Sequence, residues 1–347
     1  MWEQRYRWHG SGRRFRPLCQ LAGVVSRGCS RRLQRVLSDF GADESFHQAP
    51  AKLWEHYGIE VPVARVRQVT EQHGRQADRF LRQRAAAASP KACMVLQSDG
   101  SMLPVVDNVA SQVLDKSGED SVGQVVDKRR WKTLRYREYR LSMAYEAGSR
   151  TRYYGGTLGS VAESGEQLRG CADQVGWDRH TRLHGVGDGA PWIAEQVEAQ
   201  FGAQGRYLVD FYHVCEYLAA AAPECDPSDS AGWLATQQGR MRENQWRQVL
   251  IALLPHREPP AVPDEEAPVR VCYRYLRNRS HQLDYQGALE QGLPIGSGEI
   301  ESAHRYVVQR RMKIAGAWWK EDNAQAMLAL RICRFNGLWD EYWQQAA

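Results

Sequence analysis

The sequence predicts an α/β protein: a mixed sheet flanked by helices, with an all-helical N-terminal region and a helical insertion. Three patterns support this prediction. The N-terminal third is helical, two long strand-like stretches are followed by alternating helices and strands, and a second helical segment interrupts this alternation. Strands followed by alternating elements imply a mixed sheet with helices packed on it. We therefore divide the chain into a basic helical region (1–90), the first part of a core (91–220), an insertion (221–290) and the C-terminal helices of the core (291–347).

Charge is unevenly distributed along the 347 residues, although the net charge is only +5. Residues 1–90 carry 16 Lys and Arg against 8 Asp and Glu, and the remainder is mildly acidic. This asymmetry favours a polyanion-binding module joined to a core with another task, although a solvated basic surface would also explain it.

Cysteine spacing and hydropathy argue against disulfide-rich, zinc-cluster, secreted and membrane-spanning proteins. The eight cysteines include no CxxC pair, which argues against both a disulfide framework and a zinc cluster. No window approaches 18 uncharged apolar residues, and the first residues lack the apolar stretch of a secretory signal. We expect a cytoplasmic protein without a membrane partner.

The N-terminal region reads as three helices, ending with VPVARVRQVTEQHGRQADRFLRQR. Before this helix lies GIEVP, in which Gly58 can close one helix and Pro62 can open the next. That is the spacing of a helix-turn-helix, which would present Arg65 and Arg67 to DNA on the leading turns of the second helix. Any two short helices joined by such a turn share this pattern.

The core begins with KACMVLQSDGSMLPVV, which reads as two strands around Asp99-Gly100. The elements expected next are a strand at 131–146, a helix at about 160–175, a strand at 181–187, a helix at 191–201, a strand at 206–210 and the helix FYHVCEYLAAAA. Two helices of the insertion flank a proline-rich linker, PHREPPAVPDEEAP. The tail, GLPIGSGEIESAHRYVVQRRMKIAG, reads as a loop opening a helix, and a last helix follows at about 323–335.

The segment HGVGDGAPW allows three interpretations of Asp188. An Asp just before a helix with Pro near its first turn is ordinary N-terminal capping chemistry. The spacing of Gly185, Gly187 and Ala190 also fits a dinucleotide-binding loop. However, the carboxylate would repel a pyrophosphate, and Pro191 removes one of the N–H groups that such a loop offers.

Metal binding is the third interpretation, and two further segments of the chain with a similar pattern support it. Asp99 in LQSDGS, Asp188 in VGDGAP and Glu301 in PIGSGEIES each stand beside glycines at a strand end or a helix start. Glycines let a phosphate backbone approach, and carboxylate oxygens are the ligands that Mg²⁺ prefers. Two such ions can activate water and stabilise the leaving oxygen in phosphodiester cleavage.

Together these segments resemble the DDE transposases of bacterial insertion sequences, in the ISKra-type and Mutator-like branch. The matching stretches are LQSDGSMLPV, GVGDGAPWI, LVDFYH and PIGSGEIESAHRYVVQRRMK, and with the element order they span residues 91–335. The resemblance implies a ribonuclease-H-like core with a helical insertion. It also implies that Asp99, Asp188 and Glu301 bind two Mg²⁺ or Mn²⁺ ions. Glu301 is preferred to Glu299 because it precedes a small residue, although either side chain could point inward.

Further residues are expected to contribute to the site. LVDFYH is similar to the family's acid-x-x-His element, so Asp210 and His213 are expected near the site, although Asp210 would also cap its helix and His213 could simply pack. Four basic residues downstream of Glu301 could grip phosphates, namely Arg305, Arg310, Arg311 and Lys313. Three tryptophans could stack on an unpaired base or fill the core, namely Trp192, Trp318 and Trp319.

The function that this resemblance implies is transposition. Bound metal would support cleavage of the phosphodiester at the ends of an insertion sequence, and the freed 3′ hydroxyl would attack target DNA. The expected partners are double-stranded DNA and further copies of the chain, in a cytoplasmic protein associated with the nucleoid. Two alternatives stay open: a DNA-binding protein without catalysis, and an enzyme with a dinucleotide cofactor.

Overall fold

The computed structural model describes residues 6–7, 9–11, 14–15, 17, 21, 29–85, 88–108 and 132–346. The chain forms two compact units. Unit 1 comprises residues 1–84, 103–136 and 307–347, and unit 2 comprises residues 85–102 and 137–306. These units cut across the four segments expected from the sequence, because the C-terminal segment contributes to both.

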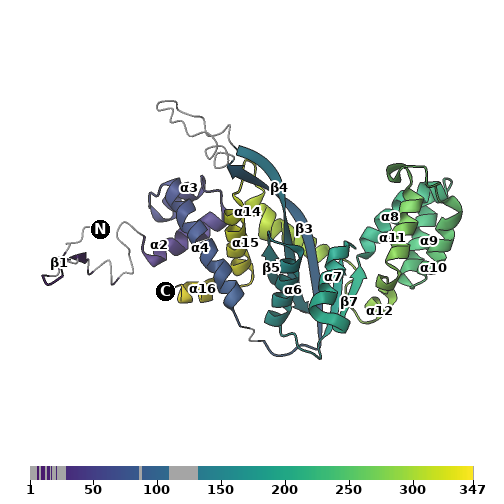
Figure 1. Ribbon diagram of the computed structural model, residues 1–347, viewed down its shortest axis with the longest axis horizontal. Coiled ribbons are helices and arrows are strands. Elements are labelled where there is room, and N and C mark those ends of the chain that lie inside the picture. The colour runs from purple at the N-terminus through teal and green to yellow at the C-terminus, as the bar shows by residue number, and fades with distance from the viewer. Residues whose placement is uncertain are drawn as a thin grey trace, which may run out of the picture. The chain divides into compact units, whose positions relative to one another are not determined.

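Unit 2 contains a mixed five-stranded sheet, with strands in the order β5-β4-β3-β6-β7 (Figure 1). The strands are β3 (Cys93–Asn108), β4 (Lys132–Glu146), β5 (Tyr153–Thr157), β6 (Arg182–Gly187) and β7 (Gly205–Val209), and the ends of β3 and β4 extend into unit 1. β6 is parallel to both β3 and β7, and β5 is antiparallel to β4. The α/β class and the mixed sheet with flanking helices are confirmed.

Helices α6 (Val161–Val175) and α7 (Pro191–Phe201) cover one face of this sheet. Met94 and Leu96 on β3 and Leu183 on β6 point to that face, where they form a buried cluster with side chains of both helices. Ser160 caps α6 by accepting a hydrogen bond from the backbone N–H of Glu163, and Gly176 ends the helix in the left-handed conformation. Alternate residues of β3, including Gln97 and Asp99, therefore point to the opposite face.

The insertion follows β7 as a lobe of helices (Figure 1). Its helices are α8 (Phe211–Cys225), α9 (Ser230–Arg242), α10 (Trp246–Leu253), α11 (Pro268–Asn278) and α12 (Tyr285–Glu290). α8 packs against α9 and α11. The chain then continues as α13 (Gly298–Ala303), a π-helix at His304–Gln309 and α14 (Arg310–Met312).

In unit 1, three helices follow the prediction for the N-terminal region: α2 (Arg31–Asp43), α3 (Ala49–Tyr57) and α4 (Val63–Gln83). Gly58 closes α3 in the left-handed conformation, and Pro62 stands immediately before α4, as expected. The last two helices, α15 (Glu321–Phe335) and α16 (Trp339–Gln345), belong to the same unit, and α15 packs along α4.

The prediction that Asp99-Gly100 separates two strands is wrong. β3 runs without interruption through both residues, because Gly100 is extended and lies against β4: a Cβ there would come within 2.3 Å of a Glu138 carboxylate oxygen. The short strand β5 and helix α16 were not predicted. Among the described residues, no helix combines the length and apolar character needed to cross a membrane.

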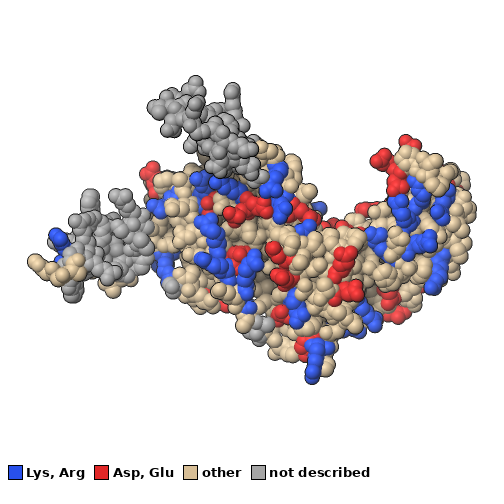
Figure 2. All heavy atoms as spheres, viewed as in Figure 1, with Lys and Arg blue, Asp and Glu red and all other residues tan. Residues whose placement is uncertain are grey.

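On the face drawn in Figure 2, basic and acidic side chains alternate over helices α2 to α4, while Lys and Arg gather over the helices of the insertion. Part of the latter charge is neutralised locally, since Arg270 and Arg274 on α11 both pair with Asp264. On this face, Lys and Arg therefore gather on the insertion, where the sequence analysis had not indicated them, and not on helices α2 to α4.

Candidate metal centre

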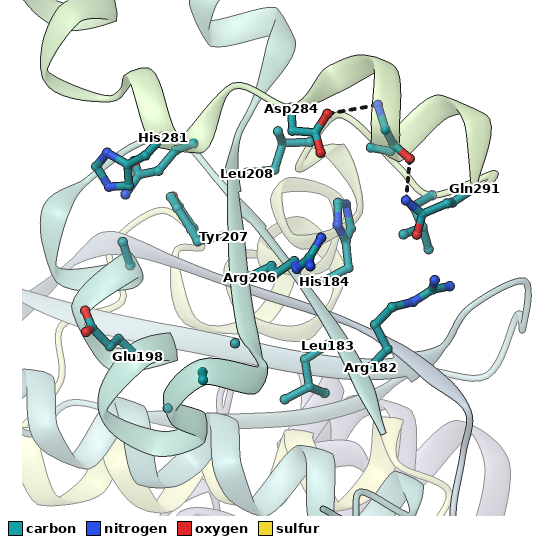
Figure 3. A pocket seen from close by; sticks show the side chains of 18 residues that line it. Arg182, Leu183, His184, Glu198, Arg206, Tyr207, Leu208, His281, Asp284 and Gln291 are labelled. Carbon is teal, nitrogen blue, oxygen red and sulfur yellow. Dashed lines mark hydrogen bonds between the residues drawn. The ribbon is translucent and has the colours of Figure 1, made fainter. Parts of the chain in front are cut away.

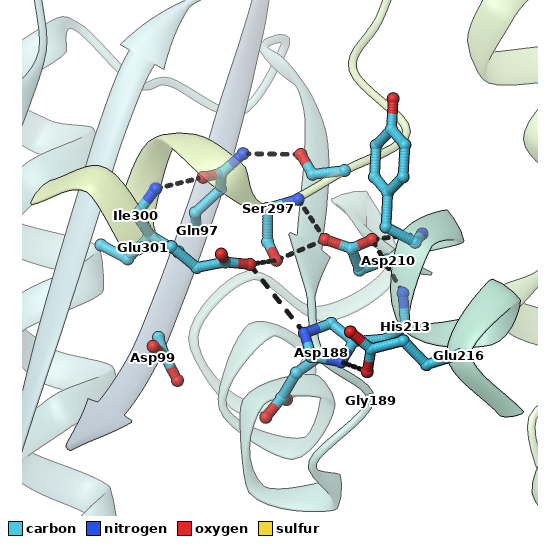
Figure 4. A network of polar contacts seen from close by, with 12 residues as sticks. Gln97, Asp99, Asp188, Gly189, Asp210, His213, Glu216, Ser297, Ile300 and Glu301 are labelled. Carbon is cyan, nitrogen blue, oxygen red and sulfur yellow. Dashed lines mark hydrogen bonds and ion pairs between the residues drawn. The ribbon is translucent and has the colours of Figure 1, made fainter. Parts of the chain in front are cut away.

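Asp99 and Asp188 are brought together by the pairing of β3 with β6. These strands are parallel, with Gln97 opposite Val186, and continuing this register by two residues brings Asp99 level with Asp188. Residues at equivalent positions of neighbouring parallel strands point to the same face, about 4.8 Å apart between strands. Figure 4 shows both carboxylates on this side of the sheet, with Glu301 above them in the view. Both residues are partly exposed, so a ligand can reach them.

Glu301 reaches the same face because α13 is fixed to β3. The side chain of Gln97 accepts a hydrogen bond from the backbone N–H of Ile300 (3.0 Å) and donates one to the carbonyl oxygen of Gly296 (3.3 Å). The amide is buried, and it satisfies two backbone groups at the start of a helix that has no side-chain cap of its own. Gln97 therefore sets the position of α13 above Asp99.

Asp210 fixes the start of α13 to α8. One of its oxygens accepts hydrogen bonds from the backbone N–H groups of Tyr212 and His213, which makes Asp210 the N-cap of α8. The other accepts from the backbone N–H and the hydroxyl of Ser297 at 2.5 and 2.6 Å. Asp210 is 1% exposed, so four bonds use the acceptor positions of a carboxylate that water cannot reach.

Asp210, His213 and Glu301 form a group that could hold a metal ion, because one ligand atom from each lies within 4.8 Å of the others. Nε2 of His213 lies 3.9 Å from Oε1 of Glu301, and the Ser297 hydroxyl lies 3.4 Å from the same oxygen. Since the hydrogen bonds of Asp210 already hold the fold together, we assign Asp210 a structural role. Glu301 and His213 are the accessible members of this group.

The three predicted metal ligands, Asp99, Asp188 and Glu301, do not lie as close together as Asp210, His213 and Glu301 do. In the part of the chain that the structure describes, the three residues whose ligand atoms lie within 4.8 Å of one another are Asp210, His213 and Glu301, and Asp99 and Asp188 are not among them. A single ion held by all three predicted carboxylates is therefore not preformed. Two ions about 3.5–4 Å apart do not require it, because each carboxylate then needs to reach only one of them.

A buried histidine faces Asp99 from the helical run that carries Glu301. His304 is 3% exposed, and its Nε2 lies 3.2 Å from Oδ2 of Asp99 without completing a hydrogen bond to any described residue. Its Nδ1 lies 2.9 Å from the hydroxyl of Tyr139, a fully buried residue of β4. If the tyrosine donates to Nδ1, the proton of His304 is on Nε2, the ring nitrogen nearer to Asp99.

The loop carrying Asp188 is held by the insertion. The hydroxyl of Tyr275 on α11 donates to the carbonyl oxygen of Asp188 (2.8 Å), and Arg279 donates twice to that of Gly189 (3.0 and 2.7 Å). The hydroxyl of Tyr207 on β7 accepts from the N–H of Gly189 (3.1 Å). Burial raises the pKa values of Tyr207 and Tyr275, so both hydroxyls stay protonated.

Glu299 and Glu301, the two alternatives for the third acid, point to different surroundings. The carboxylate of Glu299 pairs with the guanidinium of Arg152, with nitrogen to oxygen distances of 2.8 and 3.1 Å. Glu301 faces His213 and Ser297 instead, and its side chain is 53% exposed. The geometry therefore favours Glu301 as the residue available to a ligand.

Neither rival interpretation of Asp188 fits the local structure well. The N-cap of α7 is Ala190, and Asp188 instead accepts the N–H of Ala190 (2.8 Å) ahead of the helix. Gly185 and Gly187 lie inside β6, and Gly189 is the glycine with a positive φ (+87°). The glycines expected to cradle a pyrophosphate therefore belong to the strand and form no loop.

The basic residues predicted to contact DNA differ in exposure. Arg67, Arg305 and Arg310 are exposed, Arg65 and Lys313 are half-buried, and Arg311 is 2% exposed. Arg311 donates from Nε to the carbonyl oxygen of Gly41 (2.9 Å), so it does not project from a helix surface as the prediction required. Of the tryptophans, Trp319 is buried, Trp192 is half-buried beneath Arg140, and Trp318 is 57% exposed.

A cavity of about 650 Å³ lies elsewhere on unit 2, between the β6–β7 edge of the sheet and α12 (Figure 3). His184 lines it and donates from Nε2 to the carbonyl oxygen of Pro294 (2.8 Å), and burial lowers the pKa of its imidazole. Asp99, Asp188 and Glu301 do not line this cavity. It is therefore separate from the acidic residues.

Several residues that build the centre were missed in the sequence: Gln97, Tyr139, Tyr275, Arg279, Ser297 and His304. Only His304 carried a usable signal, because it stands three residues after Glu301 and so shares a helix face with it. The others act through backbone contacts between distant segments. No known protein-family model matches the chain, and neither does any curated protein sequence.

Proposed function

We propose that this protein is a DNA transposase of the DDE type, with a ribonuclease-H-like core, that cuts DNA at the ends of an insertion sequence and joins them to target DNA. The observation that carries the proposal is the placement of Asp99, Asp188 and Glu301 on one face of the sheet, from β3, the end of β6 and α13.

The order of the strands supports the fold part of this proposal. If the five strands β3 to β7 are numbered 1 to 5 along the chain, their order in the sheet is 3-2-1-4-5. Strands 4 and 5 (β6 and β7) are parallel to strand 1 (β3). A ribonuclease-H-like core is expected to have this strand order, so the order supports the proposal. The helical insertion between β7 and α13 agrees with the branch of the family that the sequence resembles.

The donor set fits Mg²⁺ or Mn²⁺, because three carboxylates offer oxygen ligands and their side chains are accessible. The buried Nε2 of His304 lies 3.2 Å from Oδ2 of Asp99 without a hydrogen bond, and it would complete one if that carboxylate turned on binding an ion. Asp99 and Asp188 would hold one ion, and Glu301 would reach a second. The ions would supply an activated water and stabilise the oxygen that leaves.

The protein's own residues hold and orient the reactants. Cleavage adds water across the bond between phosphorus and O3′, leaving a 3′ hydroxyl and a 5′ phosphate. In strand transfer, this 3′ hydroxyl attacks a phosphorus of the target and displaces the target's own O3′. His213, beside Glu301, can hydrogen bond to a phosphate oxygen. Arg305 and Arg310, both exposed and downstream of Glu301, can contact the backbone of DNA.

The proposal is tested by incubating the full chain with duplex DNA that flanks its own gene, in Mg²⁺ or in EDTA, and mapping strand breaks. We expect breaks at fixed positions with free 3′ hydroxyls, in Mg²⁺ alone. DNA binding that is equal in both conditions, without any break, would contradict the proposal and favour a DNA-binding protein without catalysis. Thermal stabilisation by NAD in the absence of DNA would instead favour a dinucleotide enzyme.

A further inference from the structure

Unit 1 contains a cavity of about 600 Å³, and Asp99, Asp188 and Glu301 do not line it. Its walls come from the segment between α2 and α3, from α4, and from the segment between α14 and α15. The side chains that matter here are aromatic or charged: Phe46, Trp318, Trp319, Arg67, Glu71, Arg311 and Lys320.

The cavity has an excess of positive charge. Arg67 and Lys320 are exposed, and neither forms an ion pair within 4.0 Å with a described residue. The acid in the lining, Glu71, already accepts a hydrogen bond from Nδ2 of Asn323 (2.9 Å). Burial raises the pKa of Glu71, whereas the nearby Arg67, Arg75 and Lys320 lower it by a smaller amount.

Arg311 adds a cation that is removed from water. It is 2% exposed, and its guanidinium carbon lies 4.6 Å from the ring centre of Phe46 and 5.1 Å from that of Trp319. Its Nη2 makes no hydrogen bond to any described residue. Burial, and secondly the nearby Arg331, lower the pKa of Arg311 to about 10. A buried charge with a donor that makes no hydrogen bond destabilises the folded state unless an opposite charge binds to it.

Trp318 supplies an aromatic surface at the same cavity. Its side chain is 57% exposed and contacts no other described ring, whereas its neighbour Trp319 is buried and donates to the carbonyl oxygen of Met312 (2.9 Å). An exposed indole beside cations that form no ion pair with a described residue offers two kinds of contact: stacking for a flat ring and charge for a phosphate. These are the contacts that single-stranded nucleic acids use on proteins.

We propose that this cavity binds one nucleoside phosphate unit, with the base stacked on Trp318 and the phosphate directed to Arg67, Lys320 and the buried Arg311. The ligand is either the end of a single strand of nucleic acid or a free nucleotide, since both present this chemistry. The site does not use Asp99, Asp188 or Glu301, so it goes beyond the proposed cleavage activity and does not depend on it.

The test measures binding of a fluorescent 12-nucleotide single strand with a 5′ phosphate to the full chain, by anisotropy in EDTA. We expect Trp318→Ala to weaken binding at least fivefold. Lys320→Gln should also weaken it and should reduce the slope of log affinity against log salt by about 0.7, the value for one lost phosphate contact on a single strand.

Two matched variants on α3 serve as controls, because they remove an exposed residue of the same type outside the cavity. Trp54→Ala and Lys52→Gln should bind the strand as the unchanged protein does. Competition by deoxyadenosine monophosphate would assign a free nucleotide as ligand, and competition by unlabelled strand alone would assign a strand end. Unchanged binding in both cavity variants, or equal losses in the controls, would overturn the proposal. Because no metal is present, this outcome is independent of whether the protein cuts DNA.

Discussion

Arg279, at the end of α11, donates two hydrogen bonds to the carbonyl oxygen of Gly189, the residue immediately after Asp188. Two donors on one acceptor restrict both the position and the orientation of that peptide group. The insertion therefore contributes to the geometry of the candidate centre, because the place of α11 determines where the Asp188 loop is held.

Removing this contact should lower activity more than stability. We expect Arg279→Ala to reduce the rate of Mg²⁺-dependent DNA cleavage by about 10- to 100-fold, since displacements of about 1 Å at a catalytic group can cost 10²-fold. The control is Arg277→Ala, an exposed arginine of the same helix. Equal rates for the two variants would show that the clamp on Gly189 does not serve catalysis.

Gly189→Ala should be destabilising for two separable reasons. Its φ of +87° is strained for alanine, and a Cβ would come within 2.3 Å of the Tyr275 hydroxyl oxygen. Gly148→Ala is the matched control, since its φ is +81° and no atom lies within 4 Å of the added Cβ. We expect a loss of about 1 kcal/mol in the free energy of unfolding for Gly148→Ala and about 1–3 kcal/mol more for Gly189→Ala. Urea titration measures both, and equal losses would exclude the steric contribution.

His304→Ala should raise the Mg²⁺ concentration needed for half-maximal cleavage. Partners that orient a metal ligand typically contribute 10- to 100-fold in metal affinity, and His304 faces Asp99 from 3.2 Å. Tyr139→Phe removes only the hydroxyl beside Nδ1, so we expect a smaller shift in the same direction. His304→Gln keeps a donor and should recover part of the loss. A rate reduced at all Mg²⁺ concentrations, with an unchanged midpoint, would contradict this positioning role.

The sequence predicted most of the elements, because their patterns are local. The apolar periodicity of residues 29–84 and the alternation from β4 to α8 each lie within one segment, and so do Gly58 and Pro62 at the turn between α3 and α4. The strand β5 was missed because YYGGT is short and contains two glycines, which are poor strand formers. β3 was divided because Asp-Gly usually marks a turn, whereas here Gly100 stays within the strand and lies beside the Glu138 side chain of β4.

The acidic residues of the candidate centre could be predicted from the sequence, but the residues that hold them in position could not. Asp99, Asp188 and Glu301 stand beside glycines in patterns that are visible in the sequence, and the capping role of Asp210 was among the alternatives. Arg279 and Gly189 are 90 residues apart, and Gln97 and Ile300 are 203 apart. Such contacts depend on how the sheet brings its segments together, and no local pattern records them.

The stability of unit 1 should fall in mild acid because of His73. Burial, and secondly Arg31, lower the pKa of His73 to about 4, while its nitrogens contact Tyr342 (2.7 Å) and Gln34 (2.9 Å). The unfolded chain, with a pKa near 6.5, then binds the proton first, so stability is complete above pH 6.5 and declines between about 6.5 and 4.

At pH 5 this linkage should cost about 1–2 kcal/mol relative to pH 7.5. Urea unfolding at both pH values measures it, and His73→Gln should lose that part of the pH dependence. Other titrating groups affect both proteins equally and cancel in the difference. The same pH dependence in the unchanged protein and in the variant would contradict the linkage.

The central claim is that Asp99, Asp188 and Glu301 together bind divalent cations, and binding of Mn²⁺ followed by electron paramagnetic resonance tests it most directly. Asp99→Asn, Asp188→Asn and Glu301→Gln should each weaken Mn²⁺ binding or abolish a bound ion. Glu299→Gln, two residues from Glu301 but paired with Arg152, should bind as the unchanged protein does. Undiminished Mn²⁺ binding in the first three variants, or an equal loss in Glu299→Gln, would contradict the account.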